Sequence, residues 1–182
     1  MMPPLQDLGG ERRSKSRVWV IACGNPLRSD DGLAWHAAEQ LRRTISAEEV
    51  EISCVHQLTP ELAESLSRAD AVIFLDATCN DAACNDAVGN DAASNHQPGT
   101  ILCKPIAASA GPVYSFHQFG PEGILSLCSA LYAATPLAFT ASICGESFDH
   151  GTTLSQRVSD ALPQFVRTVE ELLAGLITSS VS

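Results

Sequence analysis

The chain has 182 residues and a formal net charge of −10, with 45% hydrophobic and 18% charged residues. This length suits one domain with a substantial core, and the composition is ordinary for a soluble globular protein. The negative charge argues against a general nucleic-acid-binding protein, which needs a basic surface. No apolar stretch approaches the ~20 residues of a membrane-spanning helix, so we expect neither a nucleic-acid nor a membrane partner.

The cysteines and the first residues indicate the compartment. The chain has 7 cysteines, an odd count without a C-x-x-C pair, and several of them lie inside apolar runs. This pattern suits reduced thiols, so we expect a cytoplasmic protein. The polar segment 1–16 lacks the apolar core of a signal peptide, and we expect it to be a disordered leader.

Residues 17–41 predict a strand, a tight loop and a helix. The apolar run Val18–Ala22 stops before the turn formers Gly24-Asn25-Pro26, and a polar turn with Asp30 and Asp31 precedes the helical pattern. An unbroken apolar run suits a strand that is buried on both faces of a parallel sheet. The two carboxylates should therefore lie where the carboxyl end of a strand meets a helix, which is the ligand-binding edge of open α/β sheets.

The rest of the chain repeats this alternation of strands and helices. We therefore expect an α/β fold, with residues 17–177 forming a single three-layer domain and residues 178–182 a frayed tail. Its twisted, mostly parallel sheet should have about five strands, with helices on both faces. Pro105 predicts an edge strand or the end of a strand, and Pro163 should bend the last helix or mark its first turn. The expected strands are Val50–Val55, Ala71–Leu75, Thr100–Ile106 and Leu137–Cys144, and the expected helices begin near Pro60, Pro121 and Ser155.

Residues 79–98 differ in kind from their surroundings. They contain Asn-Asp-Ala three times at a spacing of five residues and few large apolar groups. This composition predicts a low-complexity insertion at the surface. Cys79, Cys84 and His96 have side chains that bind metals, but the repeat explains their spacing without that chemistry.

Two further residues occupy positions like that of Asp31. Asp76 follows the apolar run Ala71–Leu75, and His117 comes just before the helical pattern that begins at Pro121. Each has a structural interpretation, as a turn or loop residue, beside a functional one. If the strands are parallel, all three side chains should converge at one edge of the sheet. Two carboxylates and an imidazole form a mixed oxygen and nitrogen site, for which zinc, nickel, cobalt and cadmium are all chemically acceptable.

The stretch GNPLRSDDG resembles the N-terminal motif of the nickel–iron hydrogenase maturation endopeptidases, roughly G-x-G-N-x-L-x-x-D-[DE]-G. Ala22 and Ala34 replace two glycines that are usual in that family. The resemblance continues, in order, through Asp76, His117 and the late segment GESFDHGTTLS, where Cys144 and Gly145 replace a usual Gln-Pro pair. In that segment Asp149 and His150 fit solvated loop residues better than an acid and a base.

The resemblance implies a function and a site. Members of this family cut a C-terminal extension from the hydrogenase large subunit after nickel has been inserted. By resemblance, Asp31, Asp76 and His117 would be the metal-binding and catalytic residues, and Gly24, Asn25 and Asp30 would contact the substrate. The nickel would come with the large-subunit precursor, which is the implied partner, and zinc or cadmium would substitute for nickel in a crystal. The same residues also suit a metal-dependent hydrolase of a small substrate or a non-enzymatic nickel-sensing maturation chaperone.

Overall fold

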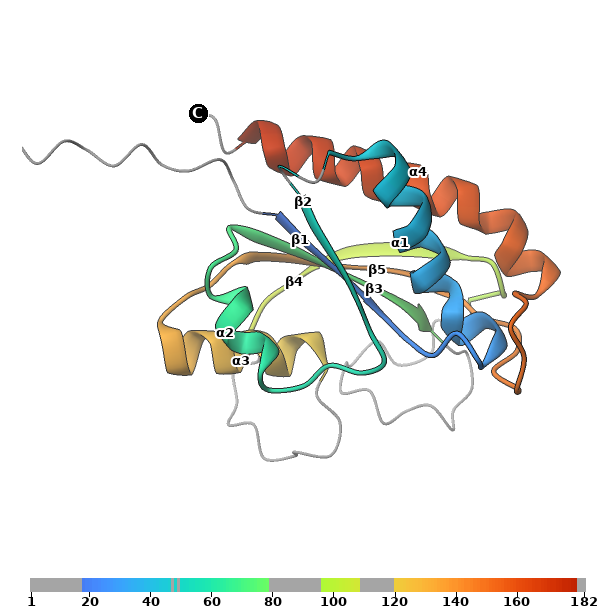
Figure 1. The fold of residues 1–182 in the computed structure, drawn as a ribbon, viewed down its shortest axis with the longest axis horizontal. Coiled ribbons are helices and arrows are strands. Elements are labelled where there is room, and N and C mark those ends of the chain that lie inside the picture. The colour runs from blue at the N-terminus through green and yellow to red at the C-terminus, as the bar shows by residue number, and fades with distance from the viewer. Residues whose placement is uncertain (1–17, 47, 49, 79–95, 109–119, 180–182) are drawn as a thin grey trace, which may run out of the picture.

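A computed structural model describes residues 18–46, 48, 50–78, 96–108 and 120–179 of the chain. It shows a five-stranded sheet with helices on both faces, in the strand order β2-β1-β3-β5-β4 (Figure 1). The expected single three-layer α/β domain is confirmed. The strands are β1 (Val18–Cys23), β2 (Val50–Val55), β3 (Ala71–Thr78), β4 (Ile101–Ile106) and β5 (Leu137–Cys144). The helices are η1 (Ser29–Gly32), α1 (Leu33–Thr44), α2 (Leu62–Leu66), α3 (Pro121–Tyr132) and α4 (Gln156–Ser179).

Four of the strands are parallel, and the fifth closes one edge of the sheet. β1 pairs with β2 and β3, and β3 pairs with β5, all in parallel register. β4 is antiparallel to β5 and has no second neighbour among the described strands, which confirms the edge position expected from Pro105. A proline is tolerated there because an edge strand needs only half of its backbone hydrogen bonds.

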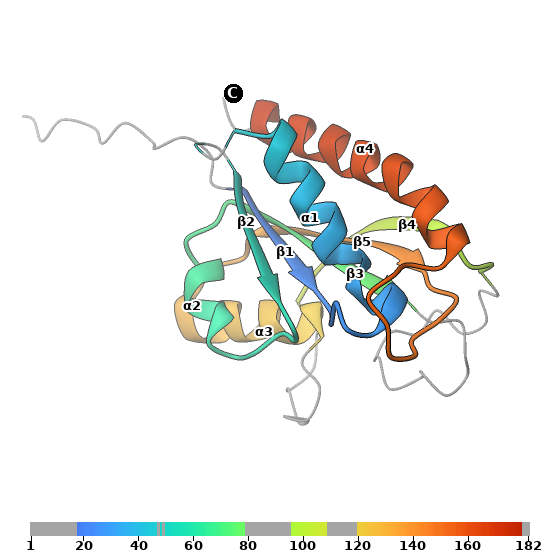
Figure 2. The same cartoon turned by 45° about the vertical axis from the view of Figure 1, so that its right-hand side comes forward.

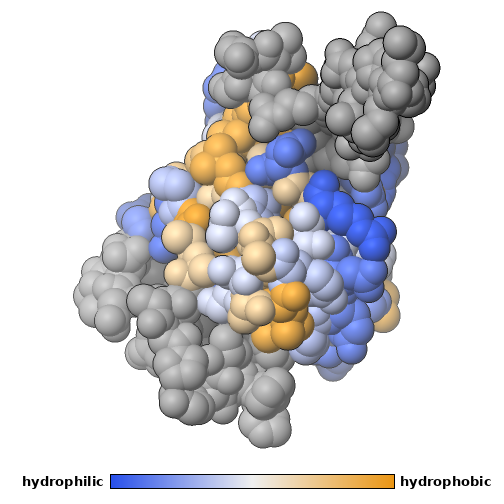
Figure 3. Space-filling model, turned by 90° about the vertical axis from the view of Figure 1, so that its left-hand side faces the viewer, coloured by the Kyte–Doolittle hydropathy of each residue, from blue (hydrophilic) through white to orange (hydrophobic). Residues whose placement is uncertain are grey.

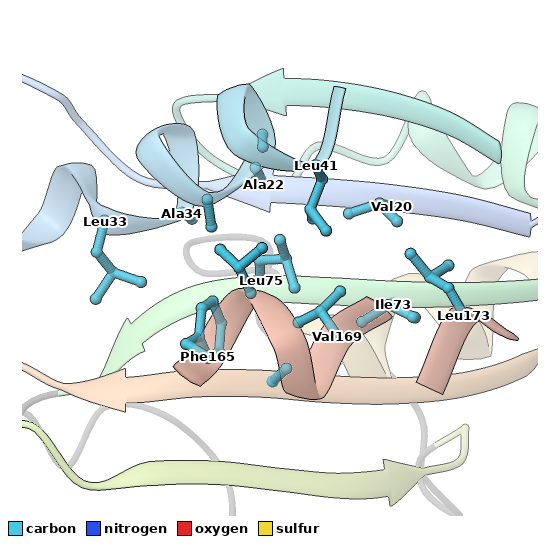
Figure 4. Close-up of a cluster of buried hydrophobic side chains, with 14 of the residues drawn as sticks. Val20, Ala22, Leu33, Ala34, Leu41, Ile73, Leu75, Phe165, Val169 and Leu173 are labelled. Atoms are coloured by element: carbon cyan, nitrogen blue, oxygen red, sulfur yellow. The ribbon is translucent and has the colours of Figure 1, made fainter. Parts of the chain in front are cut away.

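Side chains alternate across the sheet and build one core on each face. Val20, Ala22, Ile73 and Leu75 point to the layer of α1 and α4, where they pack against Phe165 and other apolar residues (Figure 4). Ile21, Phe74 and their neighbours point the opposite way, toward α2 and α3. Figure 2 shows the two helical layers on either side of the sheet. The central strands are therefore buried on both faces, which explains why they lack polar alternation.

Three expected boundaries differ from the structure. β3 does not end before Asp76 but continues to Thr78, because its pairing with β5 extends to Cys144. α4 begins at Gln156, so Pro163 lies inside the helix rather than in its first turn, and the helix ends at Ser179, inside the segment that was expected to be a frayed tail. α2 has only 5 residues. The expected leader, most of the Asn-Asp-Ala insertion and the end of the tail lie outside the described residues.

No helix in the described part of the chain is both long enough and apolar enough to cross a membrane.

Candidate functional site

The candidate site lies at the carboxyl ends of the parallel strands, on the right of Figure 1. Ala22 and Leu75 are register partners on β1 and β3, and both side chains belong to the core under α1 and α4. The next residue on each strand, Cys23 and Asp76, must therefore face the opposite layer, side by side. Asp31 comes from η1, which follows directly after the loop that leaves β1.

The turn after β1 holds the Asp31 carboxylate in place. Its Oδ2 accepts a hydrogen bond of 3.0 Å from the backbone N–H of Asn25. Gly24 has φ of +135°, and a Cβ at this position would lie 2.0 Å from the carbonyl oxygen of Asp31. Only glycine fits such a close approach at positive φ. Gly24 and Asn25 thus set the position of Asp31 through these two contacts. Contact of Gly24 and Asn25 with a substrate stays a prediction.

Asp76 carries a carboxylate whose ionisation the surroundings oppose. The surrounding protein raises its pKa from an ordinary 3.8 to about 7, mainly by desolvation. A 2.8 Å hydrogen bond from the Ala77 N–H opposes this rise, and the negative charge of Asp31 adds a smaller contribution to it. The residue nevertheless remains exposed to solvent. The charge effect shows that the two carboxylates of the predicted site lie close enough to repel each other.

Cys23 lies beside both carboxylates. Burial raises the pKa of its thiol to about 12, and the negative charges of Asp76 and Asp31 contribute to that rise. The thiol is therefore neutral at physiological pH and is a poor nucleophile. The sequence does not single out this residue, because nothing next to a run of apolar residues marks one cysteine as facing the site.

Asp30 has a different task from its neighbour. Its side chain is completely buried, and its carboxylate accepts three backbone N–H groups, from Glu146 at 2.8 Å, Ser147 at 2.9 Å and Ser155 at 2.7 Å. Burial opposes ionisation, but these donors outweigh it and keep the pKa of Asp30 below its ordinary value. Asp30 thus fixes both ends of the loop between β5 and α4, and its expected contact with substrate stays a prediction.

Further backbone hydrogen bonds join the loop 24–32, which carries Asp30, to the loop 145–155. Gly151 donates to the Leu27 carbonyl at 3.0 Å and accepts from the Ser29 N–H at 2.9 Å, and Arg28 and Gly151 form a parallel bridge. Figures 1 and 2 both show the loops 24–32 and 145–155 side by side. Asp149 and His150 are exposed in the second loop, as expected of solvated residues. The Asp31 turn is therefore supported by a distant part of the chain.

The third predicted ligand, His117, lies outside the described residues. Within the part of the chain that the structure describes, no three His, Cys, Asp or Glu side chains are arranged to hold a metal ion. What the described residues supply is a pair of repelling carboxylates, Asp31 and Asp76, at one edge of the sheet. Such a pair is suited to bind a cation, because a positive charge between the two groups removes their repulsion.

Known structures share this fold. The hydrogenase maturating endopeptidase HybD from E. coli superposes with a TM-score of 0.67 at 20% identity, over 87% of this chain and 93% of that one. The [NiFe] hydrogenase maturation protease HycI from Thermococcus kodakarensis gives 0.65 at 16% identity, over 89% and 95%. HybD from Thermococcus kodakarensis gives 0.60 at 20% identity, over 86% and 99%.

These likenesses establish the fold. The chain is an α/β protein whose architecture is that of the hydrogenase maturation endopeptidases, over most of its length and most of theirs. No protein-family model matches the sequence. A search of the curated proteins finds no match either.

Proposed function

We propose that this protein is an endopeptidase that removes a C-terminal extension from a nickel–iron hydrogenase large subunit after nickel has been inserted. In this proposal Asp31, Asp76 and His117 bind the nickel that the precursor carries. The observation that carries the proposal is the position of Asp31 and Asp76 at the carboxyl ends of neighbouring strands, in the fold of proteins named as hydrogenase maturation endopeptidases. In this proposal the chain acts as a processing protease in the cytoplasm.

The donor set suits a cation that arrives with the substrate. Asp31 and Asp76 supply oxygen donors and His117 a nitrogen donor, a combination that first-row divalent metals accept. Three protein ligands leave coordination positions open, which thiolates of the precursor would fill. In the free enzyme the two carboxylates repel each other, and one of them has a pKa near neutrality. Binding of loaded precursor would relieve this repulsion, whereas nickel-free precursor would not.

This difference in binding free energy would make cleavage depend on nickel. A site that recognises the metal of its substrate commits only loaded precursor to hydrolysis, which is a form of substrate specificity. A conventional metallopeptidase differs, because it holds its own zinc and activates water with it. The sequence contains no H-E-x-x-H motif, the common arrangement of zinc ligands and general base.

The experiment is cleavage of purified large-subunit precursor, with and without nickel, followed by mass spectrometry of the product. We expect the nickel-loaded precursor to be cut and the nickel-free precursor to stay intact, even with added zinc. Asp31→Ala, Asp76→Ala and His117→Ala should abolish cleavage and weaken precursor binding together. Asp149→Ala and His150→Ala are matched controls, because they remove an acid and an imidazole from the exposed part of the neighbouring loop.

Three outcomes would contradict the proposal. Cleavage of nickel-free precursor by a metal-loaded enzyme would indicate a conventional metallopeptidase. Nickel-dependent binding without cleavage would indicate a maturation chaperone instead of a protease. Metal-dependent hydrolysis of small substrates, with the precursor left intact, would indicate the third class of function that the same residues suit.

A further inference from the structure

Leu27 is an exposed apolar side chain on a rigid loop. Its side chain is 61% exposed, although it lies in the turn that carries Asp31. Its backbone is fixed on both sides: the Leu27 N–H donates to Asn25 Oδ1 at 3.0 Å, and the Leu27 carbonyl accepts from the Gly151 N–H at 3.0 Å. Nothing in the described part of the chain buries this side chain, so its position does not serve the core.

One residue links Leu27 to the candidate ligand. The Asn25 N–H donates to Asp31 Oδ2 at 3.0 Å, while the side chain of Asn25 accepts from Leu27. The leucine is therefore held at a fixed place relative to the Asp31 carboxylate. A partner that brings a cation to Asp31 would meet a preorganised apolar group beside it, and preorganisation lowers the entropy cost of binding.

We propose that Leu27 is an anchor that binds an apolar depression of the large-subunit precursor, next to the metal that the precursor presents to Asp31. This inference rests on the proposed function. Burial of a leucine side chain supplies binding free energy without geometric demands, whereas the metal supplies the selectivity. The surface around Leu27 carries both signs of charge, because Glu146 and Asp149 of the neighbouring loop are exposed and the exposed Arg28 donates from Nε to the Phe148 carbonyl. The precursor should therefore present both basic and acidic groups around its depression.

Among the described residues, the other large exposed apolar side chains lie at the opposite end of the molecule. Leu131, Tyr132 and Leu137 belong to the end of α3 and the start of β5, on the left of Figure 1. Figure 3 faces that end and shows apolar and polar residues intermixed. Leu131 is 66% exposed, almost the same as Leu27, but it is far from the strand ends that carry the site. It provides a matched control for the anchor.

The test compares Leu27→Ala, Leu27→Asp and Leu131→Asp with the unchanged protein on nickel-loaded precursor. Cleavage kinetics give KM and kcat, and binding of the purified precursor to immobilised protein is measured separately. We expect Leu27→Ala to raise KM about tenfold, as loss of a buried leucine side chain predicts, and Leu27→Asp to raise it further. kcat should not change, thermal unfolding should not change, and Leu131→Asp should behave as the unchanged protein does.

The outcomes separate the anchor from the function. If all variants bind and cut alike, the anchor is overturned while the protease function stands. If Leu131→Asp weakens binding as much as Leu27→Asp, the effect is one of general surface charge, and the anchor is again overturned. If the unchanged protein binds precursor without cutting it, only the protease function fails, and a loss of binding in Leu27→Asp still supports the anchor. If it does not bind precursor, both fail.

Discussion

The Oδ1 atom of Asp30 accepts a 2.7 Å hydrogen bond from the backbone N–H of Ser155, a residue 125 positions later in the chain. Ser155 directly precedes α4, so a buried negative charge lies at the amino end of the longest helix. This position is favourable because the first N–H groups of a helix lack partners within it and carry partial positive charge. Asp31, the next residue after Asp30 in the chain, belongs to the candidate site.

Replacement of Asp30 by Asn should destabilise the fold by about 2–4 kcal/mol at neutral pH, because buried N–H donors lose a charged acceptor. The pKa of Asp30 is lowered in the folded protein. Its stabilising effect is therefore present above the unfolded pKa and is lost as the pH falls through the folded pKa. Urea unfolding at several pH values should show the variant and the unchanged protein converging in acid. A constant difference at all pH values would contradict this account.

Gly24→Ala should destabilise the fold by at least about 3 kcal/mol, because the added methyl group meets the Asp31 carbonyl at a backbone angle that alanine avoids. Gly175→Ala is the matched control. Gly175 is in α4, and a Cβ there would meet nothing within 4 Å, so this change should stabilise by about 0.5–1 kcal/mol. Thermal unfolding of both variants checks the opposite signs.

Asp76→Asn should stabilise the metal-free protein above neutral pH. The pKa of Asp76 rises from an ordinary 3.8 to about 7 on folding, so the native state binds more protons than the unfolded state between these values. The contribution of Asp76 to the free energy of unfolding should therefore decrease as the pH rises from 3.8 to about 7. The advantage of the variant should be absent at pH 4 and complete at pH 8. If the variant were no more stable than the unchanged protein at pH 8, the surroundings of Asp76 would not oppose its ionisation.

The strands could be predicted because the central strands contain unbroken apolar runs, a pattern that a parallel sheet covered on both faces produces. Val18–Cys23 and Ala71–Leu75 are examples, and the carboxyl ends of their strands place Asp31 and Asp76 at one edge. The end of β3 was predicted wrongly, because Asp76 ends the apolar run without ending the backbone pairing with β5. The hydrophobic pattern of a strand indicates which of its residues are buried. The length of the strand depends instead on how far its backbone pairs with the neighbouring strand.

The structural task of Asp30 could not be predicted from the sequence. Its acceptor role depends on Glu146, Ser147 and Ser155, which are 116 to 125 residues away, and no local spacing connects them. In the sequence, Asp30 and Asp31 look equivalent. The structure separates them, since one carboxylate is buried among backbone donors while the other is only partly buried and repels Asp76. The place of His117 in the site stays a prediction.

Metal binding by the protein without its partner should depend on pH through Asp76. With a pKa of about 7, this carboxylate holds a proton in mildly acidic solution, and a divalent cation must displace that proton in order to bind. The affinity for cadmium or zinc should therefore fall about tenfold for each pH unit below 7 through this group alone, as one displaced proton requires.

Titration calorimetry with cadmium between pH 5.5 and 8 measures this dependence. Asp76→Asn should bind cadmium more weakly at pH 8. Its affinity should also depend less steeply on pH, by the slope that one displaced proton causes, because an amide has no proton for the metal to displace. Asp149→Asn, a change at an exposed carboxylate of the neighbouring loop, should keep both the affinity and the slope. If Asp76→Asn retained the full slope, the proton would belong to another group, and Asp76 would not be a ligand of the site.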